Sequence, residues 1–289
     1  MSTLGDRLLA RAIRATMVVD TAARRFDRVR SALVTRFASE SVLDAYNQLT
    51  YDATPVYEAG STSFRQGLFN WEQEMIALAF PKAPGTVLVG GAGGGREAFA
   101  LAALGYGVVA FDPSAGLARS MAREAHTTGR VDALIGRYED LPRLVSARDG
   151  TEVDLRARSP FDAAMFGWTS YSHVRTSAAR IAALRVFGEL TNGPVVVSFF
   201  LGRQRPARQA GRARRIARAL GFRPNGDSFT PYIGFYHHST AAEIEDEVRQ
   251  AGLEPSHACY DDLDGRWPYL VLRASSASST EVAEIKAPR

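Results

Sequence analysis

The sequence predicts an α/β fold: a doubly wound, mostly parallel sheet that ends in an antiparallel C-terminal β-hairpin and carries an N-terminal helical cap. Three observations support this prediction. From residue 85 onward, short apolar runs alternate with helical segments, as in parallel sheets joined by helical crossovers. The last two apolar runs follow each other without a helix between them. Upstream of residue 80, apolar residues recur at helical spacing instead.

Composition places the chain among globular proteins, with 46% hydrophobic and 23% charged residues over 289 positions. No stretch approaches 18 consecutive apolar residues, and the N-terminus has no apolar core typical of a secretory signal. Cys259 is the only cysteine, which excludes an intramolecular disulfide and a cysteine-cluster metal site, and we expect a cytoplasmic protein. Only Lys82 and Lys286 are lysines, so catalysis by a lysine has almost no candidates.

Residues 1–80 are predicted to form the helical cap. Apolar residues at three- and four-residue steps indicate a helix over residues 5–39, and a second, short helix is expected to begin at Trp71 and to end before Pro81. The stretch between them is rich in tyrosine. This region either folds over a bound ligand as a lid or buries its aromatic residues against the sheet, and the two interpretations are compatible.

Residues 81–275 are predicted to form the main domain. Strands are expected at residues 86–90, 107–111, 131–136, 161–166, 194–200, 255–260 and 268–274. Thr240 and Glu243 form a capping-box pattern that opens a helix ending before Gly252. Residues 201–239 are a basic insertion, and residues 276–289 are expected to be a disordered tail.

A glycine-rich turn joins the first strand to the first helix of this domain. Gly91, Gly93 and Gly95 lie in this turn, where backbone can approach a ligand closely and the helix N-terminus offers free N–H groups. A tight strand-to-helix crossing would also explain these glycines. Asp112 ends the second strand, where an acid can accept hydrogen bonds from ribose hydroxyls or simply cap the next helix. Together, the loop and Asp112 indicate a cofactor that contains ribose.

The glycine spacing distinguishes two such cofactors. A dinucleotide fingerprint needs glycines at positions i, i+2 and i+5, and Arg96 occupies the third position counted from Gly91. Gly93, Gly95 and Ala98 satisfy only the weaker alanine form of that pattern. A nicotinamide-dependent oxidoreductase therefore stays as an alternative. The Gly91-x-Gly93-x-Gly95 spacing suits S-adenosylmethionine better.

The segment from Thr86 to Ser114 resembles the cofactor-binding half of the class I S-adenosylmethionine-dependent methyltransferases, which have a Rossmann-like fold. The resemblance extends over roughly residues 80–275, because residues 136–142, 161–166 and 240–252 are similar to later segments of that family in the same order. It implies S-adenosylmethionine as cofactor and assigns these residues to it: Gly91, Gly93 and Gly95 near the methionine part, Asp112 at the ribose, and Tyr138 and Glu139 at the edge of the adenine.

Two departures from the family pattern concern the cofactor. Val89 stands where the family usually has an acid near the methionine amine. The acid that the family often has near the adenine amine is either replaced by Arg137 or displaced to Glu139 and Asp140. These departures keep open a third possibility, a non-catalytic cofactor-binding module on the same fold.

The resemblance also implies that the methyl acceptor lies near the end of the fourth strand, at residues 167–174. His173 is the candidate base, by its position and its ordinary pKa near neutrality. Tyr171 is the second catalytic candidate, and Trp168 would form part of an aromatic wall. Each of these three residues would fit a packing role equally well. His237 and His238 are second-rank candidates.

Missing motifs restrict the chemistry. The chain has no Asn/Asp-Pro-Pro-aromatic run for amide or adenine nitrogen, no Pro-Cys nucleophile, and no acids at residues 167–168 for a catechol-type metal site. The remaining reaction is metal-free methyl transfer to O, N or C of a small organic molecule.

Eight arginines and no acid occupy residues 203–223. This run is compatible with binding of phosphate, of an acidic substrate or of RNA, and a solvated helix face in an arginine-rich chain is the simpler explanation. Together with the basic N-terminal helix, it permits peripheral contact with an anionic membrane surface. No motif for specific nucleic-acid binding is present, and the sequence does not predict an oligomeric state.

Overall fold

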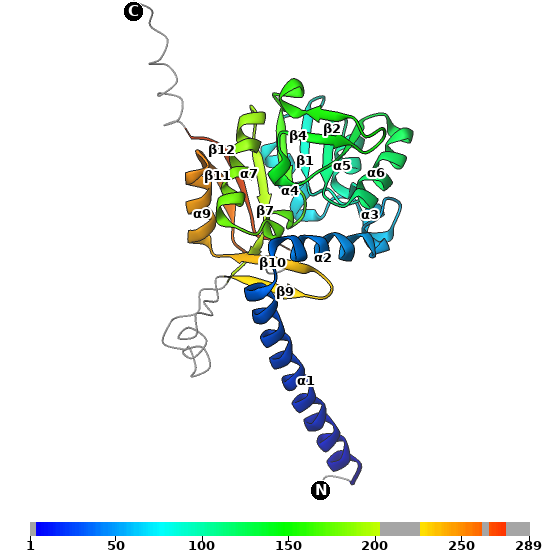
Figure 1. Ribbon diagram of the computed structural model, residues 1–289, viewed down its shortest axis with the longest axis vertical. Helices are drawn as coiled ribbons and strands as arrows, with labels where there is room; N and C mark the ends of the chain where they lie inside the picture. The colour runs from blue at the N-terminus through cyan, green and yellow to red at the C-terminus, as the bar shows by residue number, and fades with distance from the viewer. Residues whose placement is uncertain (1–3, 203–225, 262–265, 276–289) are drawn as a thin grey trace, which may run out of the picture.

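The computed structural model describes residues 4–202, 226–261 and 266–275. These residues contain a nine-stranded sheet at the centre of the molecule (Figure 1). In order across the sheet, the strands are β11 (Leu253–Cys259), β12 (Tyr269–Ala274), β7 (Val195–Ser198), β6 (Ala163–Phe166), β1 (Thr86–Gly90), β2 (Gly107–Asp112), β3 (Val131–Ile135), β4 (Arg143–Ser146) and β5 (Glu152–Asp154).

The centre of the sheet is parallel and both of its edges are antiparallel. Strands β7, β6, β1, β2 and β3 pair in parallel, and β12 and β11 form the antiparallel C-terminal hairpin that the sequence predicts. The antiparallel pair of β4 and β5 at the opposite edge was not predicted. Both strands are short and mostly polar, so their apolar pattern is too weak to indicate a strand.

Helices cover both faces of the sheet because its strands are apolar on both sides. Val87 and Val89 of β1 pack with one set of helices, and Leu88 between them packs with the other set. The first set is α4 (Asn70–Ala79), α5 (Arg96–Ala103) and α6 (Ala115–Thr128), and the second is α7 (Ser177–Leu190) and α9 (Ala241–Gln250). The predicted capping box is present, with the Glu243 N–H donating to Thr240 Oγ1 over 3.2 Å.

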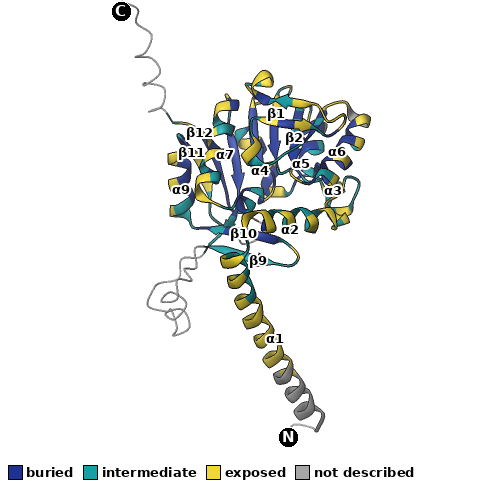
Figure 2. Ribbon diagram, in the orientation of Figure 1, coloured by how far each residue is buried: buried dark blue, intermediate teal, exposed yellow. Residues whose placement is uncertain are grey.

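The region before the sheet is helical, as predicted, and its parts lie in different places. It consists of α1 (Leu4–Phe37), α2 (Glu40–Asp52), the 3-10 turn η1 (Pro55–Tyr57), α3 (Thr62–Gln66) and α4. Helix α1 projects away from the body of the molecule, whereas α2 lies against it (Figure 1). Figure 2 shows that α1 is exposed along most of the length described, so the apolar stripe with Phe26 and Leu33 is not covered. None of the helices within the described ranges combines the length and apolarity needed to cross a membrane.

The end of α1 is anchored by a small second sheet. This sheet contains β8 (Phe200–Leu201), β10 (Gly234–Ser239) and β9 (Asp227–Thr230), in that order. The Phe229 N–H donates to Ser31 Oγ of α1 over 2.8 Å, and Leu43 of α2 packs with Phe229 and Phe235. Strands β9 and β10 belong to the predicted insertion at 201–239. Its arginine run at 203–223, like the predicted tail at 276–289, lies outside the described residues.

Candidate functional site

A cavity of about 600 Å³ lies at the carboxyl edge of the parallel strands, which is where α/β sheets usually bind ligands. Its lining comes from the loops after β1, β2, β3 and β6, from the N-terminal helices α2 and α3 with η1, and from the β9–β10 connection. This volume is within the usual range for a cofactor or substrate site.

The glycine loop forms one wall of the cavity. Gly91 and Gly93 line the cavity. Gly95 is the N-cap of α5, and a Cβ at this position would meet the side chains of Phe99 and Met121. Gly93 has a left-handed backbone with φ +54°, and a Cβ placed there would meet nothing closer than the Tyr57 carbonyl at 3.9 Å. The backbone of Gly93 therefore faces open space, as a close approach by a ligand requires.

Asp112 lies at the end of β2 and lines the same cavity. Its Oδ2 accepts from the Gly93 N–H over 2.7 Å, and its Oδ1 accepts from the Ser114 N–H over 2.9 Å. Burial raises the pKa of Asp112 to about 6, although both backbone hydrogen bonds act to lower it. Each carboxylate oxygen has two lone pairs, so the group can hold the glycine loop and still accept from a ligand.

Tyr138 and Glu139 both line the cavity but lie in different environments. They belong to the 3-10 turn η2 (Tyr138–Asp140) after β3. The Tyr138 ring stacks on Phe166, and its Oη lies 2.7 Å from Ser170 Oγ and close to Gly91. Tyr138 is thus packed beneath the glycine loop, whereas Glu139 is exposed at the rim.

A buried charge cluster beside the glycine loop was missed by sequence reasoning. Arg96 binds both oxygens of Glu72 of α4, at 2.6 and 2.7 Å, and Glu97 Oε1 at 2.6 Å. The backbone N–H of Trp168 donates to the same Glu97 oxygen over 3.0 Å. Arg96 and Glu97 line the cavity, while Val89 is fully buried in β1. The adjacency of Arg96 and Glu97 to the loop was visible in the sequence, but the part played by Glu72 depends on how α4 packs.

His173 lines the cavity at the end of the 3-10 turn η4 (Ser170–His173). Its Nδ1 lies 2.7 Å from the Phe235 carbonyl oxygen, and its Nε2 lies 3.0 Å from Tyr51 Oη of α2. A carbonyl only accepts, so we assign the ring proton to Nδ1, and Nε2 accepts from the Tyr51 hydroxyl. Burial lowers the pKa of His173, although the hydrogen bond to Phe235 raises it. The imidazole is therefore neutral at neutral pH.

Tyr171 is fully buried and is absent from the described lining of the cavity. Its hydroxyl donates to Glu247 Oε2 of α9 over 2.5 Å, and Glu247 also binds Arg180 of α7. The Arg180 guanidinium in turn donates to the Val174 carbonyl over 3.1 Å. Tyr171 therefore joins η4 to α9, and in this structure it has no access to a bound ligand.

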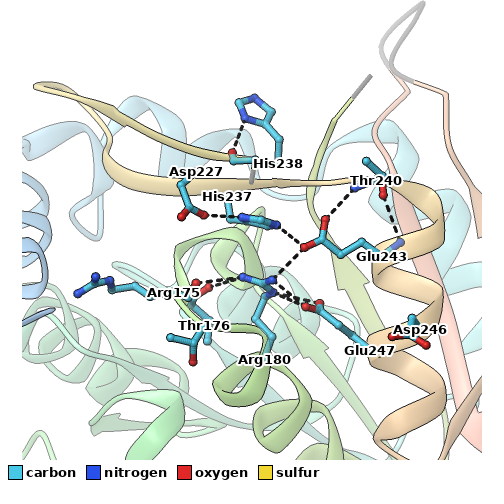
Figure 3. Close-up of polar contacts among 12 residues, drawn as sticks. Arg175, Thr176, Arg180, Asp227, His237, His238, Thr240, Glu243, Asp246 and Glu247 are labelled. Atoms are coloured by element: carbon cyan, nitrogen blue, oxygen red, sulfur yellow. Dashed lines mark hydrogen bonds and ion pairs between the residues drawn. The ribbon is translucent and has the colours of Figure 1, made fainter. Parts of the chain in front are cut away.

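His237 and His238 also lie outside the described lining of the cavity. His237 lies between Asp227, 2.7 Å from Nδ1, and Glu243, 2.9 Å from Nε2, as Figure 3 shows. Glu243 also contacts Arg180 at 3.4 Å. This partly buried chain of polar contacts connects the small sheet to α9 and α7.

No protein-family model matches the sequence, and no curated protein matches it. Solved structures match the fold. The CcbJ methyltransferase from Streptomyces caelestis aligns with a TM-score of 0.54 and 18% identity, over 78% of this chain and 98% of that one. An S-adenosylmethionine-dependent methyltransferase from Methanosarcina mazei aligns with a TM-score of 0.52 and 15% identity, over 73% of this chain and all of the other. The chain thus has the fold of the class I methyltransferases, as its sequence resemblance implies.

Proposed function

We propose that the protein is a methyltransferase that uses S-adenosylmethionine to methylate O, N or C of a small organic molecule. One observation carries the proposal: on a methyltransferase fold, the glycine loop, Asp112 and His173 line a single cavity. The cavity suits the cofactor, because Gly93 presents open backbone and Asp112 presents a carboxylate to it.

The cofactor contacts are proposed residue by residue. The backbone at Gly91 and Gly93 approaches the methionine part, and Asp112 accepts from the ribose hydroxyls. Glu139 edges the adenine from the rim, while Tyr138 supports the glycine loop from below. Glu97, directly after the loop, supplies to the methionine amine the carboxylate that is absent at Val89. When bound, the cofactor supplies a methyl group on a positively charged sulfur.

Tyr51 and His173 are proposed to remove the proton of the acceptor. The Tyr51 oxygen takes that proton while its own proton passes to Nε2 of His173 over the 3.0 Å hydrogen bond. The Phe235 carbonyl holds the Nδ1–H and so keeps the ring in this tautomer and stabilises the imidazolium. Tyr171 acts as a positioning residue through Glu247. An acceptor that needs no deprotonation would rely on alignment alone.

No metal ion is assigned to this reaction. In the described ranges, no group of three or more His, Cys, Asp and Glu side chains is arranged to hold a metal ion.

The test is a turnover screen. The protein and S-adenosylmethionine are incubated with a library of hydroxylated and amino-substituted small molecules, and each product is analysed by mass spectrometry. We expect one compound to gain the mass of one methyl group while S-adenosylhomocysteine accumulates, and the Asp112→Ala variant to lose most of this activity. Binding of S-adenosylhomocysteine without turnover of any compound would favour the non-catalytic module, and binding of NADH in its place would favour the oxidoreductase.

We also propose that α1 permits peripheral contact with an anionic membrane. Its exposed side presents Val18, Phe26, Val29 and Leu33, and arginines outnumber acids along it. Co-sedimentation with phosphatidylserine vesicles, but not with phosphatidylcholine vesicles, is the expected result. Equal recovery with both vesicle types would contradict it.

A further inference from the structure

One arginine of the cavity forms no ion pair with any of the described residues. Among the described residues, three arginines line the cavity. Arg96 is paired with Glu72 and Glu97, and Arg137 is paired with Asp44 at 2.9 Å. Arg175 differs from both. Among the described residues, its buried Nε and Nη1 have no hydrogen-bond partner, and no carboxylate forms an ion pair with it.

Arg175 is held in place by its backbone. Its carbonyl oxygen accepts from Arg180 Nη1 over 3.2 Å, and the Val174 carbonyl accepts from the same nitrogen over 3.1 Å. The guanidinium of Arg175 lies over the Phe235 ring, 5.4 Å from its centre. Figure 3 shows this side chain pointing away from Arg180 and Glu247, so that cluster does not neutralise it. Arg175 is half-buried, and two of its guanidinium nitrogens are buried without a hydrogen-bond partner in the described part of the chain. Burial of polar groups without hydrogen bonds is costly, and a ligand anion that binds this guanidinium would offset that cost.

A second unpaired donor lies in the same cavity. The indole Nε1 of Trp267, which also lines the cavity, is buried and has no hydrogen-bond partner among the residues that the structure describes. The Trp267 ring lies edge-on to the Trp168 ring, with the two ring centres 5.2 Å apart. It also lies edge-on to the Phe200 ring, with the ring centres 5.9 Å apart. An indole N–H and a guanidinium donate hydrogen bonds and accept none. A matching ligand therefore has a flat apolar ring, which fits the aromatic side chains, and a group that only accepts hydrogen bonds, which fits the two donors.

We propose that the methyl acceptor is an aromatic carboxylic acid whose carboxylate pairs with Arg175. This inference rests on the proposed function and names its substrate class. The planar guanidinium matches both oxygens of a carboxylate, and the aromatic side chains beside it match a flat ring. His173 lies two residues before Arg175 on the same segment. Anchoring the carboxylate on Arg175 thus fixes the distance from the acid group to the atom that faces Tyr51 and His173.

The experiment compares acids with their own amides. Protein saturated with S-adenosylhomocysteine is titrated calorimetrically with hydroxybenzoic and hydroxynaphthoic acids and with the corresponding primary amides. For at least one pair, we expect the acid to bind wild type about tenfold or more tightly than the amide. The reason is that only the carboxylate of the acid can form charge-assisted hydrogen bonds with Arg175 through both of its oxygens. In Arg175→Leu, the affinities for the acid and the amide should differ by no more than about threefold. Arg175→Lys should keep part of the preference for the acid.

A matched variant controls for the lost charge. Arg65 of α3 is exposed and does not line the cavity, so Arg65→Leu should keep the acid preference of wild type. If the amides bind wild type as well as the acids do, if no acid binds, or if the preference survives in Arg175→Leu, the inference is overturned. Should Arg175→Leu fail to fold, Arg175→Gln replaces it.

The S-adenosylhomocysteine titration of each variant separates the two proposals. Failure of wild type to bind S-adenosylhomocysteine contradicts the proposed function. Normal binding of S-adenosylhomocysteine without an acid preference contradicts only the role of Arg175.

Discussion

The cavity has two halves that the chain builds in different ways. The half assigned to the cofactor comes from neighbouring stretches of sequence, the turns after β1, β2 and β3, and backbone groups such as the Gly93 N–H shape it. The half assigned to the acceptor is assembled from distant segments. Asn47 of α2 binds the backbone N–H of Phe235 over 2.8 Å, 188 residues away in the sequence, and Tyr51 meets His173 across 122 residues. Changes in one half should therefore leave the other half largely intact.

The largest effect is expected from His173→Ala. Loss of the base should lower kcat by roughly 10²–10⁴ for an acceptor found in the turnover screen. Affinity for S-adenosylhomocysteine should barely change, because His173 belongs to the acceptor half. In wild type, protonation of the imidazole removes the base, so the rate should fall at acidic pH. Because burial lowers the pKa of His173, that fall should come below pH 6.5. A variant that keeps kcat within about threefold would exclude His173 as the base.

Gly93→Val should break the cofactor half. The valine side chain would occupy the open space in front of the loop, and we expect S-adenosylhomocysteine affinity to fall by about a hundredfold or more. Gly150, between β4 and β5, is the matched control: its φ of +77° is also left-handed, and no atom lies within 4 Å of its missing Cβ. Gly150→Val should carry the same backbone strain and keep its affinity. If both variants lost S-adenosylhomocysteine affinity equally, backbone strain and not a blocked cavity would explain the loss.

Protonation of Asp112 should change S-adenosylhomocysteine affinity less than Gly93→Val does. Burial raises the pKa of Asp112 to about 6, and a protonated carboxyl accepts fewer hydrogen bonds from ribose hydroxyls. S-adenosylhomocysteine affinity should therefore weaken as the pH falls below about 6, by at most about tenfold per pH unit. Calorimetry from pH 5 to 8 measures this, and Asp112→Asn should lack the dependence. An affinity that is flat with pH in wild type would argue against a ribose contact.

The smallest effect concerns stability on the acceptor side. Burial lowers the pKa of His237, but its hydrogen bonds with Asp227 and Glu243 raise it more, so the net shift is upward. The stabilisation is complete below the unfolded pKa of about 6.5 and is lost as the pH rises through the folded pKa. The melting temperature should therefore drop as the pH rises through that range, by ~2–4 °C for each kcal/mol of stabilisation that is lost. His237→Gln should not show this drop.

How much the sequence predicts follows the same division. The strand at residues 86–90, the turn with Gly91 and Gly93, and the position of Asp112 all depend on local patterns, and the structure has them where they were expected. Tyr171 and His173 lie two residues apart, yet only His173 lines the described cavity. The sequence cannot distinguish them, because the direction of each side chain depends on how α9 packs against η4.

The residues that sequence reasoning missed depend on long-range packing. Tyr51 reaches His173 only because α2 lies across the cavity, and Glu72 meets Arg96 only through α4. No local pattern marks Arg175 as the cavity arginine without an ion pair among the described residues, since that requires knowing which carboxylates Arg96 and Arg137 bind.

Binding of S-adenosylhomocysteine, compared with binding of NADH, tests the central claim most directly. Both ligands are titrated calorimetrically into wild type and into Asp112→Ala. We expect wild type to bind S-adenosylhomocysteine and not NADH, and Asp112→Ala to bind it about tenfold or more weakly, since charge-assisted hydrogen bonds to the ribose are lost. Preferential binding of NADH, or unchanged S-adenosylhomocysteine affinity in a folded Asp112→Ala variant, would contradict the cofactor site described for this fold.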